Sequence, residues 1–321
     1  MTIQPAQSQD EAWSWSTMRQ DDGEHLDTCS RGDVLAENRP EPTVASVQLG
    51  RRMRKYRDEA GVSAKAAAEA IDGSTPKISR YETGRQWPLK RIEIAELLRL
   101  YERTPKEVAD TLALMEKAKL PDWWQDEAGV VPQGLGQLFA VETAADELRT
   151  VSSGMLFGML QIEEYAREII SVHTMDQSLV EGRVRLRLRR QELLRRASPP
   201  SLLALIDESA LRRVIGSRAI MRDQISHLID LAALPNITIR VVTFEAGAHK
   251  GLTNAFLWLK LPRETEMPDV VYTESLSGST YFTKEDQVAG FADAFTSIET
   301  LSLGPDDSVD FLRSLQEFHS R

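Results

Sequence analysis

The sequence predicts a multidomain chain in which an all-α domain of five helices is followed by an α/β (α+β) domain. Over residues 46–119, apolar side chains recur at helical spacing in stretches that Gly, Pro and capping residues separate. From residue 142 onward, helical stretches alternate with runs rich in β-branched residues, such as Ile-Thr-Ile-Arg-Val-Val at 237–242. The length of 321 residues is enough for two domains with buried cores.

Composition divides the chain into four segments, 1–45, 46–119, 120–141 and 142–321. The first is polar and acidic with little hydrophobic periodicity, so we expect a disordered tail. The third is a connector rich in Pro and Gly. It contains Trp123 and Trp124, which we expect to pack between domains rather than to form a ligand cage.

The overall composition is typical of a soluble protein, with 41% hydrophobic and 27% charged residues. No apolar run approaches the roughly 18 residues of a membrane span, and no signal peptide opens the chain. The single cysteine, Cys29, excludes an internal disulfide, and the five histidines lack metal-ligand spacing. We expect a cytoplasmic protein without a cofactor, a metal site or a membrane partner.

The outer helices of the first domain are indicated by periodicity and caps. The first is expected over 46–60, with an inward stripe of Val47, Leu49, Gly50, Met53 and Tyr56. The fourth is expected over 89–101, with buried Ile92, Ala95, Leu97, Leu98 and Tyr101. The sequence Thr-Pro-Lys-Glu at 104–107 is a capping box, and it predicts a fifth helix that continues to about residue 119.

Between them, residues 61–85 indicate two short helices joined by a tight turn. The first has a small apolar face of Ala66, Ala67, Ala70 and Ile71. It is expected to end at Asp72-Gly73, because Gly adopts a positive φ at low cost. Ser74 is a favourable N-cap for the second helix, and Pro76 fits within its first turn.

The second of these helices presents small polar and basic side chains outward: Thr75, Lys77, Ser79 and Arg80. Two short helices with such a face form a helix-turn-helix, whose second helix enters the major groove of DNA. Double-stranded DNA is therefore the expected partner.

The distribution of charge agrees with this interpretation, although the whole chain has a net charge of −10. Residues 46–119 hold 16 Lys or Arg against 11 Asp or Glu, a net charge of +5, while 1–45 and 120–321 are acidic. Positive charge is thus confined to the segment where attraction to phosphates requires it. The acidic tail has a second interpretation, as an arm that competes with DNA for the basic domain.

Residues 46–119 resemble the lambda-repressor-like helix-turn-helix domain of the XRE family. The resemblance rests on LGRRMRKYR at 49–57, GVS at 61–63 and STPKISRYETGR at 74–85. It implies that base edges or their backbone are faced by Thr75, Pro76, Lys77 and Arg80, and that phosphates are contacted by Ser74 and Arg85. It also implies a salt bridge between Arg57 and Glu82. Family members have Thr-Gln where this chain has Ser63-Ala64, so Lys65 is the candidate replacement for the lost Gln contact.

The elements expected in the second domain come from the same patterns. Helices are expected at 142–148, 162–171, 176–197, 208–215, 220–233, 284–301 and 306–318. Strands are expected at 201–206, 237–244, 255–261 and 270–274. The helix at 176–197 contains a run of arginines, which we interpret as a solvated or internally paired face in preference to a second DNA surface.

From about residue 142 to its end, the chain is similar to the sensor-like region attached to XRE domains in actinobacterial regulators. The motifs include GMLQIEEYAR at 158–167, AALPNITIRV at 232–241, FEAGAHKGL at 244–252 and PDVVYTESLSG at 268–278. Phe157 and Ile162 depart from the Pro and Thr that are typical there. The resemblance implies that a small acidic partner protein is encoded nearby.

One cluster in this domain invites a catalytic interpretation. His249 lies in an expected loop near Glu274 and several serines, but no G-x-S-x-G elbow accompanies them. We therefore predict no enzyme activity, and we name His249 and Glu274 as candidate pocket residues beside the alternative of a structural loop histidine.

The function that these observations predict is a sequence-specific DNA-binding transcriptional regulator that acts as a homodimer. Its C-terminal domain would respond to a small molecule or to a partner protein. The alternative is an antitoxin-like interaction protein that sequesters a small partner encoded beside it and uses DNA binding for autoregulation. An enzyme fused to a DNA-binding domain is the weakest hypothesis, because no catalytic set is visible.

Overall fold

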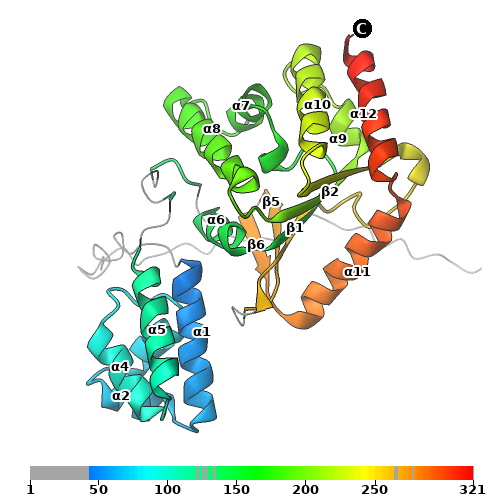
Figure 1. Ribbon diagram of the computed structural model, residues 1–321. Helices are drawn as coiled ribbons and strands as arrows, with labels where there is room; N and C mark the ends of the chain where they lie inside the picture. Colours follow the sequence, from blue (N-terminus) through cyan, green and yellow to red (C-terminus); the bar gives the residue numbers. More distant parts are fainter. Residues whose placement is uncertain are drawn as a thin grey trace, which may run out of the picture. The chain divides into compact units, whose positions relative to one another are not determined.

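The computed structural model describes residues 43–320, with gaps at 121–122, 125–126, 128, 133–134, 264–266 and 277. The expected disordered tail falls outside the described residues as far as residue 42. The described chain consists of a five-helix domain followed by a domain built on a six-stranded mixed sheet (Figure 1). This arrangement confirms the predicted fold class.

The first domain contains α1 (Val44–Glu59), α2 (Ala64–Ala70), α3 (Thr75–Glu82), α4 (Arg91–Leu100) and α5 (Pro105–Ala118). Their apolar faces meet in one core, whose largest members include Leu49, Met53, Ile78, Leu97 and Tyr101. The capping box predicted at the start of α5 is present. Thr104 Oγ1 accepts from the Glu107 amide at 3.3 Å, and Glu107 Oε2 accepts from the Thr104 amide at 2.8 Å.

One expected core position of α4 is wrong. Ile92 is 84% exposed, and Ile94, which is fully buried, takes the inward position. Two apolar residues two positions apart lie about 200° apart around a helix, so only one of them can face the core. Their periodicity alone could not decide between them.

The turn between α2 and α3 also differs from expectation in two details. Asp72, rather than Gly73, adopts the left-handed conformation, with φ of 47°. Asp is one of the few residues with a side chain that tolerates this region. Ser74 occupies the N-cap of α3 as predicted, but its side chain makes no capping hydrogen bond.

Two glycines allow α1 and α3 to approach each other closely. Gly84, at the end of α3, has φ of 72°, and a Cβ atom there would lie 2.7 Å from the Val47 amide nitrogen. A Cβ atom on Gly50 would overlap the Tyr81 carbonyl oxygen. These two glycines therefore determine how closely α3 packs against α1, and with it how far the exposed side of α3 projects from the domain.

The sheet of the second domain has the strand order β3-β2-β1-β4-β5-β6. Its strands are β1 (Glu147–Ser152), β2 (Ser201–Asp207), β3 (Ile237–Val242), β4 (Phe256–Lys260), β5 (Val270–Ser275) and β6 (Gly278–Phe282). β1, β2 and β3 are parallel, whereas β4, β5 and β6 extend the sheet by antiparallel pairing. The sheet therefore combines a parallel βαβ half with an antiparallel meander.

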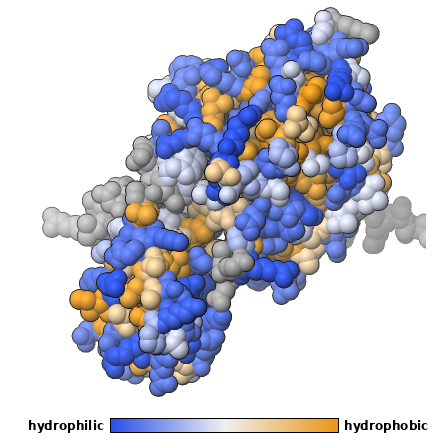
Figure 2. Space-filling model, in the orientation of Figure 1, coloured by the Kyte–Doolittle hydropathy of each residue, from blue (hydrophilic) through white to orange (hydrophobic). Residues whose placement is uncertain are grey.

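The helices of this domain are α6 (Leu135–Ala144), α7 (Glu163–Ser171), α8 (Gln177–Gln191), α9 (Glu208–Arg212), α10 (Arg218–Ala232), α11 (Glu285–Leu301) and α12 (Pro305–Ser320). Short 3-10 turns occur at Gly158–Leu160, Glu192–Arg195 and Phe244–Ala246. Figure 2 shows hydrophobic residues between the helices of this domain and mostly hydrophilic residues on their outward sides. No helix among the described residues is long and apolar enough to cross a bilayer.

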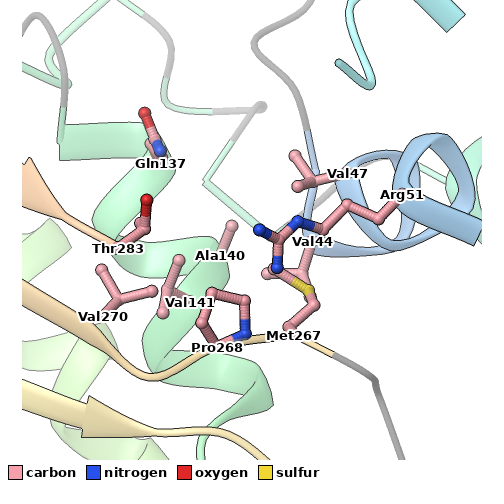
Figure 3. Close-up of a pocket in the computed structure, with 10 residues that line it drawn as sticks. All are labelled: Val44, Val47, Arg51, Gln137, Ala140, Val141, Met267, Pro268, Val270 and Thr283. Carbon is pink, nitrogen blue, oxygen red and sulfur yellow. The ribbon is translucent and has the colours of Figure 1, made fainter. Parts of the chain in front are cut away.

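Alternate residues of the strands supply two separate cores. Leu257 and Leu259 face the larger core with α10 and α12, whereas Phe256 and Trp258 face the smaller one with Phe295 of α11. This is the period of two that a sheet covered on both faces requires. α6 lies on the face of the larger core, where Ala140 and Val141 lie close to Val270 (Figure 3).

Two strands were not anticipated from the sequence. The helix expected at 142–148 is wrong in its second half, because α6 ends at Ala144 and β1 begins at Glu147. β1 lies between β2 and β4, so ladder pairing on both sides outweighs its local helix preference. β6 is a polar strand at the edge of the sheet, and it therefore lacks the apolar signal of a buried strand.

Candidate functional site

The exposed side of α3 is the candidate surface for DNA. Thr75, Pro76 and Ser79 are exposed, and Arg80 beside them is half-buried. Arg80 Nε donates to Gln86 Oε1 at 3.1 Å, and this contact holds the guanidinium group at the edge of the helix. The exposed side chains on this surface are small and mostly polar, so another molecule can approach the backbone of the helix.

Three further candidates surround this side of the domain. Ser74, at the N-cap of α3, is exposed and keeps its hydroxyl free of a capping bond. Arg85, which follows Gly84, is exposed as well. Lys65 on α2 has an 83% exposed side chain, and its Nζ lies 4.0 Å from Glu69 Oε1. A hydroxyl and two cations of this kind are suited to phosphate oxygens.

Lys77, which the sequence places on the outer face, lies in a different environment. Its side chain is 18% exposed, and its Nζ lies 2.7 Å from Glu93 Oε2. Tyr81 donates its hydroxyl to the same oxygen at 2.8 Å, and Lys90 Nζ lies 3.2 Å from Oε1. Burial opposes ionisation of Glu93, but hydrogen bonds from Lys77, Tyr81 and Lys90 outweigh it and lower its pKa. The charge of Lys77 is thus balanced within the domain.

A second ion pair braces α3 against α1. Arg57 Nε donates to Glu82 Oε1 at 2.5 Å, and Nη2 donates to Oε2 at 3.1 Å. Arg57 Nη1 also donates to the Val62 carbonyl at 3.0 Å. The hydrogen bond to Glu82 raises the pKa of Arg57, although burial acts in the opposite direction. The structure therefore brings together the two residues that the resemblance pairs, in a bidentate geometry that fixes one helix against another.

Sequence reasoning missed Glu93 and Gln86, which hold Lys77 and Arg80 in place. Glu93 lies in the first turn of α4, where an acidic residue is ordinarily explained by the helix dipole. No sequence pattern linked it to a lysine 16 positions earlier. Gln86 lies in the loop after α3 and has no motif of its own.

The two candidate pocket residues of the second domain have different surroundings. His249 has a side chain only 2% exposed; its Nε2 lies 3.1 Å from Asp207 Oδ2, and its Nδ1 accepts from the Gly251 amide. Glu274 is exposed at the end of β5 and lines a cavity between α6, α7 and α8. No hydrogen bond or ion pair joins His249 to Glu274 within the described ranges. His249 therefore holds its own loop to the end of β2.

The arginine run of α8 is engaged largely within the domain. Arg190 forms a bidentate pair with Glu142, and the two side chains are 9% and 1% exposed. The Arg190 guanidinium also lies over the rings of Phe139 and Phe157, at 5.4 and 5.2 Å from their centroids. Arg187 Nη1 donates to Gln161 Oε1 at 2.7 Å.

The tandem tryptophans pack onto the same region. Trp123 stacks on Phe139 at a ring separation of 5.5 Å, and Trp124 meets Phe139 edge-on at 6.0 Å. Arg189 lies over Trp123 at 5.4 Å. Where the structure describes the chain, it places no group of three or more His, Cys, Asp or Glu for a metal ion.

Comparison with known proteins matches two parts of the chain to family models. Residues 48–111 match a model described as a helix-turn-helix domain, and residues 135–314 match one described as a domain of unknown function, DUF5753. No curated protein matches the chain. A crystal structure of the clp gene regulator ClgR from C. glutamicum is 26% identical and covers 26% of this chain and all of its own. Its TM-score of 0.20 is too low to support a conclusion.

Proposed function

Because the chain belongs to the DUF5753 family and carries a helix-turn-helix domain, we propose that it is a sequence-specific DNA-binding transcriptional regulator of the cytoplasm. The observation that carries this proposal is the exposed face of α3, which lies in the one net-basic segment of an acidic chain. An uncharged or acidic face on α3 would have argued against DNA, since phosphate attraction supplies most non-specific affinity.

Within this proposal the candidate residues have different roles. Thr75, Pro76, Ser79 and Arg80 meet base edges or the adjoining backbone in the major groove. Phosphates are contacted by Ser74, Arg85 and Lys65. Lys77 would reach DNA only by leaving Glu93, so we assign it a positioning role for α3.

We further propose that the protein binds as a homodimer to a two-fold site. In helix-turn-helix proteins of this kind, half-sites lie about 34–36 Å apart, which is one turn of DNA. A signal received by the C-terminal domain would change the spacing of the two α3 helices and with it the affinity for DNA. The cavity beside α8 supports a small molecule as that signal.

The test is a comparison of two arginine variants on a duplex selected by the protein from random sequences. Arg80→Ala should weaken binding of that duplex about 10- to 100-fold, since a specific base contact contributes about 1–3 kcal/mol. Arg99→Ala, an exposed arginine of α4 that pairs with Glu96, is the matched control and should bind as the wild type. Fluorescence anisotropy at one fixed salt concentration measures both.

If Arg80→Ala bound the selected duplex with the same affinity as the wild type, α3 would not be the recognition helix. Co-purification of a small acidic protein with the wild-type chain, together with loss of DNA binding in that complex, would instead favour the antitoxin-like function.

A further inference from the structure

A cavity of about 200 Å³ lies between α6, α7 and α8 of the C-terminal domain. Its wall is largely apolar and includes Phe139, Met155, Ile169 and Leu186. An apolar cavity of about 150 Å³ is large enough to hold benzene. This cavity can therefore accommodate a ring or a short hydrocarbon chain together with one small polar group.

The polar part of the wall is mainly cationic. Arg183, Arg187 and Arg190 project from α8 at positions i, i+4 and i+7, so they share one side of the helix. Arg190 is fully committed to Glu142 through its bidentate pair. Arg183 donates through Nε to the Val130 carbonyl, a neutral acceptor, at 3.3 Å.

Arg187, like Arg183, has a neutral hydrogen-bond partner. Within the described ranges its hydrogen-bond partner is Gln161, which carries no charge, and no carboxylate lies within ion-pair distance. Burial and the neighbouring charge of Arg190 together lower the pKa of Arg187 to about 10, although Glu274 and Tyr165 act in the opposite direction. Arg187 is only partly exposed to solvent. A partly buried cation without an ion-pair partner is costly, and a bound anion would reduce that cost.

Glu274, which also lines the cavity, does not supply the missing charge. It is exposed to solvent, and its attraction raises the pKa of Arg187 less than burial and Arg190 lower it. The wall therefore combines apolar side chains with the arginines of α8.

We infer that this cavity binds a small organic monocarboxylate with an aromatic or short aliphatic body. The planar guanidinium of Arg187 matches a carboxylate in a fork-to-fork geometry, and Arg183 lies one turn away on the same side of α8. The apolar wall favours an acid with a hydrocarbon body over inorganic phosphate, because phosphate has no apolar part to contact that wall. This inference names the ligand class for the sensor role in the proposed function and rests on that proposal for its regulatory meaning.

The test is isothermal titration calorimetry of the full chain, without DNA, using benzoate and hexanoate as probes. Benzamide and hexanamide are the neutral counterparts of the same shape, and inorganic phosphate is the anion without a hydrocarbon body. We expect at least one acid to bind, with its amide weaker by about tenfold or more, since the charge-assisted contact is lost. Absence of binding by both acids, equal binding of acid and amide, or equal binding of phosphate would overturn the inference.

Variants locate the binding to Arg187. Arg187→Gln should weaken binding of the acid about tenfold or more, whereas Arg185→Gln, an exposed arginine of the same helix, should leave it within about twofold. Glu274→Gln should tighten binding about two- to threefold, because one repelling charge in the cavity wall is removed. If Arg187→Gln does not fold, Arg183→Gln serves in its place and should weaken binding by about threefold.

The affinity of the ligand-free chain for DNA is measured separately by anisotropy, so the two proposals fail in different ways. Binding of an acid without any DNA binding would contradict the proposed function and leave the cavity assignment intact. If the chain bound DNA but neither acid, only the cavity assignment would be contradicted. The same conclusion would follow if the chain bound DNA and Arg187→Gln bound the acid as tightly as the wild type.

Discussion

On α3 of the helical domain, Ser74, Thr75 and Ser79 face solvent beside Arg80, whereas on α8 of the C-terminal domain a much denser run of arginines is turned largely toward protein. Arg190 is buried against Glu142, and Arg187 lies against Gln161 at a cavity wall. The two helices show that the density of arginine in a sequence does not by itself mark a surface for nucleic acid. What matters is which side of the helix is buried and which acids lie opposite.

The comparison extends to the ion pairs of each domain. In the helical domain, Glu82 and Glu93 hold Arg57 and Lys77, and thereby position α3. In the C-terminal domain, Glu142 holds Arg190 inside the core. The partly buried ion pairs of the first domain orient an exposed face. In the second domain Glu142 neutralises Arg190 and leaves Arg183 and Arg187 with neutral partners.

The largest expected effect comes from breaking the pair in the C-terminal domain. Glu142→Gln leaves the Arg190 charge buried without compensation, and breaking such a pair costs about 3–5 kcal/mol of stability. Hydrogen exchange measured by mass spectrometry should show faster exchange in α6 and α8. Glu192→Gln, an exposed acid that follows α8, is the control and should exchange as the wild type.

The double variant Glu142→Met/Arg190→Met sharpens this result. Replacing a buried ion pair with apolar residues of similar volume is often neutral for stability. We therefore expect exchange rates close to those of the wild type. Loss of protection as large as in Glu142→Gln would mean that the pair has a role beyond cancelling its own charges.

The fold class and the helix-turn-helix could be predicted from the sequence because their signals are local. The capping box at Thr104, the glycine at 84 and the apolar stripe of α1 each specify structure within a few residues. The partner of Lys77 could not be predicted, since Glu93 approaches it through the packing of α4 on α3. The cavity could not be predicted either, because the charge of its wall depends on which of the arginines in α8 Glu142 neutralises.

The next largest effect concerns the brace between α1 and α3. Glu82→Gln removes the charge from a bidentate pair whose side chains are 14% and 11% exposed, and hydrogen bonds to charged groups contribute about 1.5–3 kcal/mol. Exchange should accelerate in α1 and α3 but not in α10. Unchanged protection in α3 would show that glycine-mediated packing alone holds this helix in place.

A smaller effect is expected from a phosphate contact at the edge of the α3 face. Arg85→Ala should weaken binding similarly for all duplex sequences, and it should reduce the slope of log affinity against log salt by about 0.9. Arg80→Ala, in contrast, should lower the preference for the selected duplex. Titrations at several salt concentrations distinguish the two, and a sequence-dependent loss in Arg85→Ala would reverse the assigned roles.

The smallest expected effect is a dependence on pH that belongs to the helical domain alone. Glu93 has a pKa below its ordinary value of 4.5 in the folded protein, so the folded state favours its carboxylate form. Its contribution to stability is therefore present above about pH 4.5 and is lost as the pH falls through the lower folded-state value. Glu93→Gln should show less acid-induced loss of protection in α3 and α4 than the wild type, by hydrogen exchange corrected for intrinsic rates. Asp110→Asn, which replaces an exposed acid of α5, is the control and should behave as the wild type. If Asp110→Asn reduces the acid-induced loss of protection as much as Glu93→Gln does, that loss reflects the general charge of the domain and not the network that positions Lys77.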